Sequence, residues 1–236
     1  MKTAELTLPP NVHLERFDDA DSLCDALAGH IAERIGAAVS ERDTAALALS
    51  GGRTPLPLFE RLRREALPWD HVQITLADDR WVATDSPDSN EGLVREHLLQ
   101  DNAAASRFIA LWQPDSSARS AEMDCNRRLA VLPELLDIVI LGMGNDGHTA
   151  SLFPCSNDLG RALTTAQPCC AVTPTSAPHD RMTLSARRLL ASRERILHLK
   201  GEDKLETLQR ALSGEDVSEM PIRLFLQQPL TIYWSP

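Results

Sequence analysis

Short, nearly uninterrupted apolar runs that alternate with helical segments are the feature that most restricts how this chain can fold. Such runs cover residues 45–49 (AALAL), 72–77 (VQITLA) and 138–141 (IVIL). Strands that are apolar at successive positions, rather than at every second position, are typical of parallel sheets buried on both faces. The intervening helices then cover those faces. The sequence therefore predicts an α/β fold: a Rossmann-like open, mostly parallel sheet with helices on both faces.

The remaining elements continue this alternation. Residues 21–39 carry Leu23, Leu27, Ile31, Ile35 and Val39 at four-residue steps, which predicts an amphipathic helix. The other predicted helices cover residues 57–65, 91–99, 121–132, 186–191 and 204–212, and the other predicted strands cover residues 108–111, 181–184, 196–199 and 230–234. Because no linker, repeat or low-complexity run divides the chain, residues 1–236 are predicted to form one domain.

Composition excludes several classes of protein. The apolar fraction of 43% is enough for a sizeable core. The 24 Lys and Arg residues against 34 Asp and Glu give a net charge of −10, which argues against binding to nucleic acid or to an anionic membrane. No apolar run reaches the roughly 18 residues that span a bilayer, and the first residues do not resemble a signal peptide. The five cysteines include no C-x-x-C pair, so we expect no disulfide framework, no zinc site and a reduced, cytoplasmic protein.

Glycines concentrate in two places, both directly after a predicted strand. Of only 11 glycines, Gly51 and Gly52 form the first group, within residues 50–55 (SGGRTP). Free N–H groups in such a turn, together with the N-terminus of the next helix, can bind an anion. The spacing matches neither a Walker A loop nor a G-x-G-x-x-G fingerprint, so no nucleotide cofactor is predicted. A tight turn without a ligand is the alternative.

The second group of glycines surrounds a carboxylate and an imidazole. Gly142, Gly144 and Gly147 lie within residues 142–154 (GMGNDGHTASLFP), which also carry Asp146 and His148. Parallel strands end at one edge of their sheet, so we expect this loop and the first glycine turn at the same edge. A neutral imidazole suits general-base catalysis, and a nearby carboxylate can orient it and stabilise its cation. A histidine with only a packing role is the alternative.

Further charged side chains flank predicted strands and helices. Asp78 and Arg80 follow the strand at 72–77, Arg181 begins the strand at 181–184, and Lys204 begins the helix at 204–212. Guanidinium groups bind phosphate through paired hydrogen bonds. Taken alone, these side chains are equally consistent with solvated turns and a local ion pair. The other histidines show no metal-ligand spacing and have no assigned role: His13, His30, His71, His97, His179 and His198.

Together these segments resemble the 6-phosphogluconolactonase family. The most specific match is GHTASLFP at residues 147–154. In two places the chain departs from the family pattern: Asp79 stands where the family commonly has Glu, and the chain ends at Trp234-Ser235-Pro236, where many members continue with a further Asp and a short helix. The matching residues occur in family order between residues 50 and 204: Ser50, Gly51, Gly52, Thr54, Pro55, Asp78, Arg80, Asp88, Ser89, Asn90, the run 142–154, Arg181, Met182, Thr183, Gly201 and Lys204.

The resemblance implies hydrolysis of 6-phospho-D-glucono-1,5-lactone to 6-phospho-D-gluconate in the oxidative pentose phosphate pathway. His148 would be the general base that activates water, and Asp146 would orient it. Backbone N–H groups of the two glycine loops are the candidates for oxyanion stabilisation. The partner would be a small phosphorylated sugar lactone, with no cofactor and no metal ion, and the oligomeric state stays open. The implied substrate-binding residues are Ser50, Gly51, Gly52, Arg53, Asp78, Arg80, Arg181 and Lys204.

Three other functions are alternatives. Glucosamine-6-phosphate deaminases resemble this family, but their loop carries a catalytic Glu before the proline, where this chain has Phe153. Non-catalytic sugar-phosphate sensors also share the fold; they carry an N-terminal helix-turn-helix, and we expect no room for one before the helix at 21–39. A lactonase that acts on other sugar lactones is the third alternative, because specificity depends on loops.

Overall fold

The computed structural model describes residues 6–236, and its centre is an open sheet of seven strands. Every strand pairing in this sheet is parallel, which confirms the predicted fold class. Residues 1–5, which belong to the predicted domain and to the N-terminal segment considered for a signal peptide, lie outside the described residues. In sheet order the strands are β1 (Val12–Arg16), β10 (Leu230–Ser235), β9 (Ser192–Lys200), β6 (Leu136–Leu141), β2 (Ala45–Leu49), β3 (Val72–Leu76) and β5 (Arg107–Ile109).

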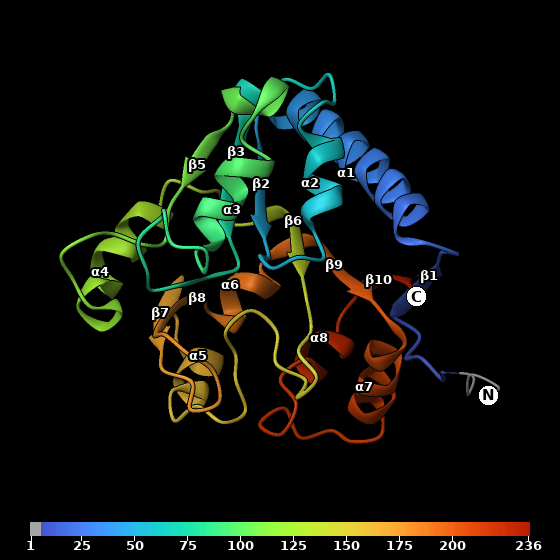
Figure 1. Ribbon diagram of the computed structural model, residues 1–236, viewed down its shortest axis with the longest axis vertical. Helices are drawn as coiled ribbons and strands as arrows, with labels where there is room; N and C mark the ends of the chain where they lie inside the picture. The colour runs from blue at the N-terminus through green and yellow to red at the C-terminus, as the bar shows by residue number, and fades with distance from the viewer. Residues whose placement is uncertain (1–5) are drawn as a thin grey trace.

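Helices flank the sheet, and the longest packs across its middle. Helix α1 (Ala20–Arg42) contacts β2, β6 and β10 and lies beside α2 (Leu56–Leu62) (Figure 1). It begins where the Asp19 side chain accepts a hydrogen bond from the Ser22 N–H, which satisfies one of the free donors of the first turn. No helix within residues 6–236 is long and apolar enough to cross a membrane. The other α-helices are α3 (Asn90–His97), α4 (Ala118–Leu129), α5 (Leu159–Thr164), α6 (Ala186–Leu190), α7 (Glu202–Leu212) and α8 (Arg223–Leu226).

A second, smaller sheet lies beside the carboxyl ends of the large one. Its strands β4 (Asp78–Arg80), β8 (Arg181–Leu184) and β7 (Cys169–Val172) pair antiparallel in the order β4-β8-β7. The sequence predicted only the strand at 181–184, so the separate sheet is a correction to the picture of a single sheet. Its register places Arg80 directly opposite Arg181. Two guanidinium groups therefore meet at one end of this sheet.

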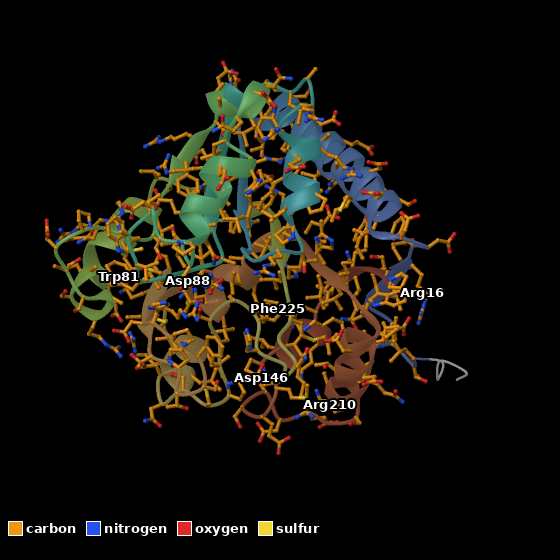
Figure 2. The ribbon with its side chains drawn as sticks, viewed as in Figure 1. Arg16, Trp81, Asp88, Asp146, Arg210 and Phe225 are labelled. Atoms are coloured by element: carbon orange, nitrogen blue, oxygen red, sulfur yellow. The ribbon has the colours of Figure 1, made fainter. Side chains whose placement is uncertain are left out.

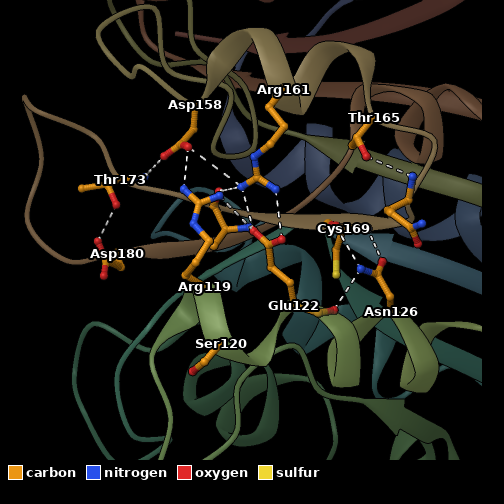
Figure 3. Close-up of polar contacts among 12 residues, drawn as sticks. Arg119, Ser120, Glu122, Asn126, Asp158, Arg161, Thr165, Cys169, Thr173 and Asp180 are labelled. Carbon is orange, nitrogen blue, oxygen red and sulfur yellow. Dashed lines mark hydrogen bonds and ion pairs between the residues drawn. The ribbon is translucent and has the colours of Figure 1, made fainter.

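An ion pair joins α4 to α5, and hydrogen bonds hold the loop after β7 beside them (Figure 3). Glu122 of α4 accepts hydrogen bonds from both terminal nitrogens of Arg161 on α5, at 3.0 and 2.7 Å. Asp158 accepts a hydrogen bond from the Thr173 N–H at 3.1 Å, and the Thr173 hydroxyl donates to Asp180 at 2.7 Å. These contacts hold the segment that leads directly into Arg181.

Candidate active site

The sequence-predicted residues gather around one cavity of ≈ 480 Å³ at the carboxyl ends of β2, β6 and β9. In Figure 2, Asp88, just before α3, and Asp146, on the loop after β6, both lie on this side of the large sheet. The small sheet supplies one wall of the cavity and the start of α7 supplies another. Eight of the ten predicted residues line it: Ser50, Gly51, Gly52, Asp78, Arg80, His148, Arg181 and Lys204.

The other two predicted residues lie outside the cavity lining. Asp146 reaches the cavity indirectly, through its hydrogen bond to His148. Arg53 is exposed in the turn before α2, and its side chain has no place in the wall. A role of Arg53 in substrate binding therefore stays a prediction. Its neighbours Gly51 and Gly52 line the cavity, whereas the Arg53 side chain is exposed.

The loop after β6 holds His148 against Asp146. Nδ1 of His148 lies 2.5 Å from Oδ1 of Asp146, and the same oxygen accepts the His148 backbone N–H at 3.1 Å. Gly144 donates its N–H to the His148 carbonyl at 2.9 Å, which closes the loop. A Cβ atom on Gly144 would lie 2.1 Å from Cε1 of His148, and Gly147 has a φ of +79°. Glycine is therefore required at both positions for the imidazole to sit where it does.

The electrostatics of this pair suit a base at Nε2. Although burial raises the pKa of Asp146, its hydrogen bonds to His148 and the charge of that ring outweigh burial and lower the pKa below its usual value. An ionised Asp146 accepts a hydrogen bond from the N–H at Nδ1 of His148. The lone pair of the ring is then on Nε2, where it is free. The ring of Phe153 packs on the imidazole with 4.2 Å between ring centroids. The imidazole is thus fixed in both tautomer and orientation.

The wall on the small sheet carries positive charge. Arg181 is 6% exposed, donates from Nη2 to the Pro178 carbonyl at 3.0 Å, and has a buried Nε without a partner among the described residues. Burial lowers its pKa below the usual value, yet a guanidinium stays protonated at neutral pH. Arg80 donates to the Asp88 carbonyl at 2.7 Å, and His179 contacts the Asp88 carboxylate at 3.1 Å. This wall is suited to an anion.

Lys204 enters the cavity from the opposite side. It lies in the first turn of α7, which begins after Gly201, a residue with a φ of +104°. Its ammonium contacts Oδ1 of Asn145, in the loop that also carries Asp146. The N-terminus of a helix adds partial positive charge to that of the ammonium group. A third cationic group, after Arg80 and Arg181, therefore faces the ligand space.

The adjacent carboxyl groups of Asp78 and Asp79 both support the site, and they do so through hydrogen bonds to different segments. Asp78 accepts a hydrogen bond from the Ser151 hydroxyl at 2.5 Å, which ties β4 to the loop of His148. Asp79 is fully buried and accepts the backbone N–H groups of Asn90 at 2.7 Å and Glu91 at 3.1 Å, at the start of α3. Burial raises the pKa of Asp79 to about 7 despite those hydrogen bonds. Asp79 thus positions the start of α3.

Among the cavity residues that had no assigned role in the sequence are Asn90, His179 and His198. Asn90 donates to the Asp78 carbonyl at 2.9 Å, and its Oδ1 is buried without a partner in the described chain. A Cβ atom on Gly51 would lie 1.9 Å from that oxygen, so Asn90 occupies the space that the glycine leaves. The run 88–90 was part of the family resemblance and could have identified Asn90. Nothing in the sequence around His179 or His198 signals a site.

His198 gives a testable dependence of stability on pH. Burial lowers the pKa of His198 to about 4, whereas an unperturbed histidine titrates near about 6.5. Between these values the unfolded chain binds a proton that the native ring does not, so the free energy of unfolding falls as the pH drops. We expect this ring to remove about 2 kcal/mol of unfolding free energy between pH 7 and pH 5. Urea denaturation of wild type and His198→Leu at pH 7 and pH 5 measures this effect. A difference in unfolding free energy between the two proteins that is the same at both pH values would contradict the prediction.

Comparison with known proteins places the chain in a family. Residues 18–234 match the model for glucosamine-6-phosphate isomerases/6-phosphogluconolactonase. A 6-phosphogluconolactonase from Pseudomonas putida is 44% identical, over 100% of this chain and 98% of that protein, and one from Rhizobium meliloti is 40% identical over 96% and 99%. The crystal structure of a 6-phosphogluconolactonase from Shewanella baltica is 45% identical, with a TM-score of 0.95 over 98% of this chain and 100% of that one. This chain therefore belongs to the glucosamine-6-phosphate isomerase/6-phosphogluconolactonase family.

Proposed function

We propose that the chain hydrolyses 6-phospho-D-glucono-1,5-lactone to 6-phospho-D-gluconate, a step of the oxidative pentose phosphate pathway. The observation that carries the proposal is a histidine held by a carboxylate next to a wall with two arginines, Arg80 and Arg181. An imidazole base serves ester hydrolysis, and paired guanidinium groups serve a phosphate. The relatives named above carry the same activity in their names. All five cysteines are free, in keeping with the reducing cytoplasm that we propose as the location.

The reaction begins at Nε2 of His148. This nitrogen takes a proton from a water molecule as the water oxygen forms a bond to C1 of the lactone. The carbonyl electron pair moves onto its oxygen, which gives a tetrahedral oxyanion and an imidazolium that Asp146 stabilises. When the intermediate collapses, the bond from C1 to the ring oxygen breaks, and the imidazolium returns its proton to that oxygen. The product is the open-chain acid, which ionises in water.

Backbone N–H groups stabilise the oxyanion in this proposal. The N–H groups of Gly51 and Gly52 follow β2 and make no hydrogen bond within residues 6–236. Ser50 anchors the turn, because its N–H donates to the Ile140 carbonyl of β6 at 3.0 Å. Preorganised donors of this kind account for a large part of the rate in acyl transfer. The fixed turn therefore offers the developing charge donors that need no rearrangement.

The phosphate interacts with the cationic side chains. Arg80 and Arg181 provide paired donors on one wall, and Lys204 provides an ammonium on the other. Asp78 keeps the loop of His148 in register with that wall through Ser151. A phosphate held between these groups leaves the lactone ring over His148. The substrate is thereby a small phosphorylated sugar lactone.

The deaminase alternative has little support in the geometry. Phe153 occupies the position of the carboxylate that ring opening and isomerisation need in deaminases, and its ring packs on His148. An aromatic ring at 4.2 Å between centroids supplies no proton. The Asp146–His148 pair suffices for one hydrolytic step.

The test of the proposed function is turnover of freshly prepared 6-phosphogluconolactone by the purified chain, followed by the loss of the lactone signal in NMR. Spontaneous hydrolysis, unphosphorylated gluconolactone and glucosamine 6-phosphate are the comparisons. We expect fast turnover of the phosphorylated lactone, slow turnover of gluconolactone and none of glucosamine 6-phosphate. A rate equal to spontaneous hydrolysis would overturn the proposal.

A further inference from the structure

His198 is a cavity residue that the hydrolytic mechanism leaves unused. It lies near the carboxyl end of β9, on the same face of the sheet as Glu194, since residues four apart on a strand point the same way. Glu194 contacts His30 of α1 at 2.5 Å, so this is the face that α1 covers. The ring is 6% exposed, and His198 lines the same cavity as His148. The cavity therefore extends along β9 beneath the α1 side of the sheet.

Open space lies beside His198. The register pairs Leu141 of β6 with Leu197 of β9, so Gly142 is the neighbour of His198 across the strands. A Cβ atom added to Gly142 would meet nothing within 4 Å. On the β6 side the neighbour of His198 thus carries no side chain, and the space at Gly142 is open, whereas on the β10 side the neighbour of His198 is Tyr233. A group of the substrate can occupy this space.

The two ring nitrogens of His198 are in different situations. Nδ1 is completely buried and has no hydrogen-bond partner within the described residues. Nε2 is not completely buried and makes no hydrogen bond within the described residues. It is therefore the nitrogen that a ligand can reach. Burial lowers the pKa of the ring to about 4, which keeps it neutral at neutral pH. Because a buried N–H without an acceptor is rarer than a buried acceptor without a donor, the single proton belongs on Nε2.

We propose that His198 donates a hydrogen bond from Nε2 to a non-reacting hydroxyl oxygen of the sugar, and so helps to select the substrate. The proposal rests on the proposed function, because it assumes a sugar lactone in this cavity. A neutral donor suits a hydroxyl group, whereas a phosphate is bound more strongly by the cationic side chains of the cavity, which include Lys200 at the end of β9. His198 is thus a substrate-binding residue distinct from the base.

The unpartnered Nδ1 supports a role in binding. A buried polar atom without a partner lowers stability, and an apolar side chain of similar size in its place is neutral or stabilising. Local rules of stability are commonly broken at functional sites. His198 breaks such a rule at the edge of the ligand space. Replacement of His198 by an apolar side chain of similar size should therefore weaken substrate binding without lowering the stability of the fold.

Three substitutions separate the nitrogens. Leucine removes both; glutamine places an amide N–H near the position of Nε2; asparagine places its amide near that of Nδ1. We expect His198→Leu to raise KM about tenfold and to change kcat by less than about threefold, with a melting temperature equal to or above that of wild type. His198→Gln should recover most of the affinity, and His198→Asn should not. An unchanged KM in His198→Leu, or equal recovery by both amides, would overturn the proposal.

A measurement on the wild type avoids dependence on any variant. Ring ¹⁵N NMR, with the His198 signals assigned by their absence in His198→Gln, should show a neutral ring protonated at Nε2, and the Nε2 signal should shift when 6-phosphogluconate is added. An unshifted signal in the presence of bound 6-phosphogluconate would overturn the proposal. Wild-type protein that does not hydrolyse the lactone would overturn the proposed function instead, so the two failures are distinguishable.

Discussion

Replacement of His148 by alanine is expected to lower kcat for 6-phosphogluconolactone by about 10³-fold, within the span of general-base catalysis, and to change KM by less than about threefold. Nε2 of His148 is the only group of the Asp146–His148 pair with a free lone pair toward the cavity, because Asp146 occupies Nδ1 at 2.5 Å. Without the imidazole, water must attack without a base, although the cationic walls still bind the phosphate. Single-turnover and steady-state rates of lactone loss measure both constants.

The matched control is His13→Ala, which removes an exposed histidine from β1. We expect its kcat and KM to equal those of the wild type. Turnover that persists in His148→Ala would assign the base to another group, and Asp146 would be the first to test. A loss of folded structure in the variant, visible in circular dichroism, is not expected, since the loop around His148 is closed by backbone hydrogen bonds.

Six of the seven strands of the large sheet could be predicted from their apolar runs, whereas β1, with one buried residue in five, was missed. Residues 45–49 are buried without exception, and so are residues 136–141, as strands covered on both faces must be. The long helix was predictable for a similar reason, because its buried leucines and isoleucines recur at helical spacing. A strand that is buried on both faces, or a helix that is buried on one face, can therefore be predicted from the spacing of its apolar residues.

The small sheet could not be predicted in the same way. Strand β4 consists of Asp78, Asp79 and Arg80. The two carboxyl groups can be buried because Asp78 accepts a hydrogen bond from the Ser151 hydroxyl and Asp79 accepts hydrogen bonds from the start of α3. A polar run of three residues indicates a loop unless those partners are known. Because partners distant in sequence stabilise this strand, only the folded chain reveals it. The antiparallel strand β7 was missed with it.

The residues of the candidate site also differ in how far they could be predicted from the sequence. The pair of Asp146 and His148 was predictable because both lie in one short loop. The meeting of Arg80 and Arg181 depends on the register of β4 and β8, which no local pattern specifies. His198 was missed because its burial and its unpartnered nitrogen result from the packing of other elements. Local chemistry could be predicted, but the walls of the cavity could not.

Replacement of Arg181 by alanine is expected to raise KM for the phosphorylated lactone about 10²-fold, the effect of losing charge-assisted hydrogen bonds worth about 2–3 kcal/mol, with kcat changed by less than about threefold. Arg181 is 6% exposed; its Nη2 donates to the Pro178 carbonyl, and its Nε is buried without a partner in the described chain. Such a charge is costly unless an anion completes its hydrogen bonds. Steady-state kinetics at varied lactone concentration measure the effect.

The contrast between substrates decides what the arginine does. Unphosphorylated gluconolactone offers Arg181 no phosphate, so the variant and the wild type should hydrolyse it with the same kcat/KM. Arg187→Ala removes an exposed guanidinium from α6 and should leave KM for both substrates unchanged. An equal fall in kcat and kcat/KM for the phosphorylated lactone would mean that Arg181 acts only in the transition state. A fall with both lactones would mean that the arginine shapes the site of His148, since Arg181 lies over the Phe153 ring that packs on this imidazole.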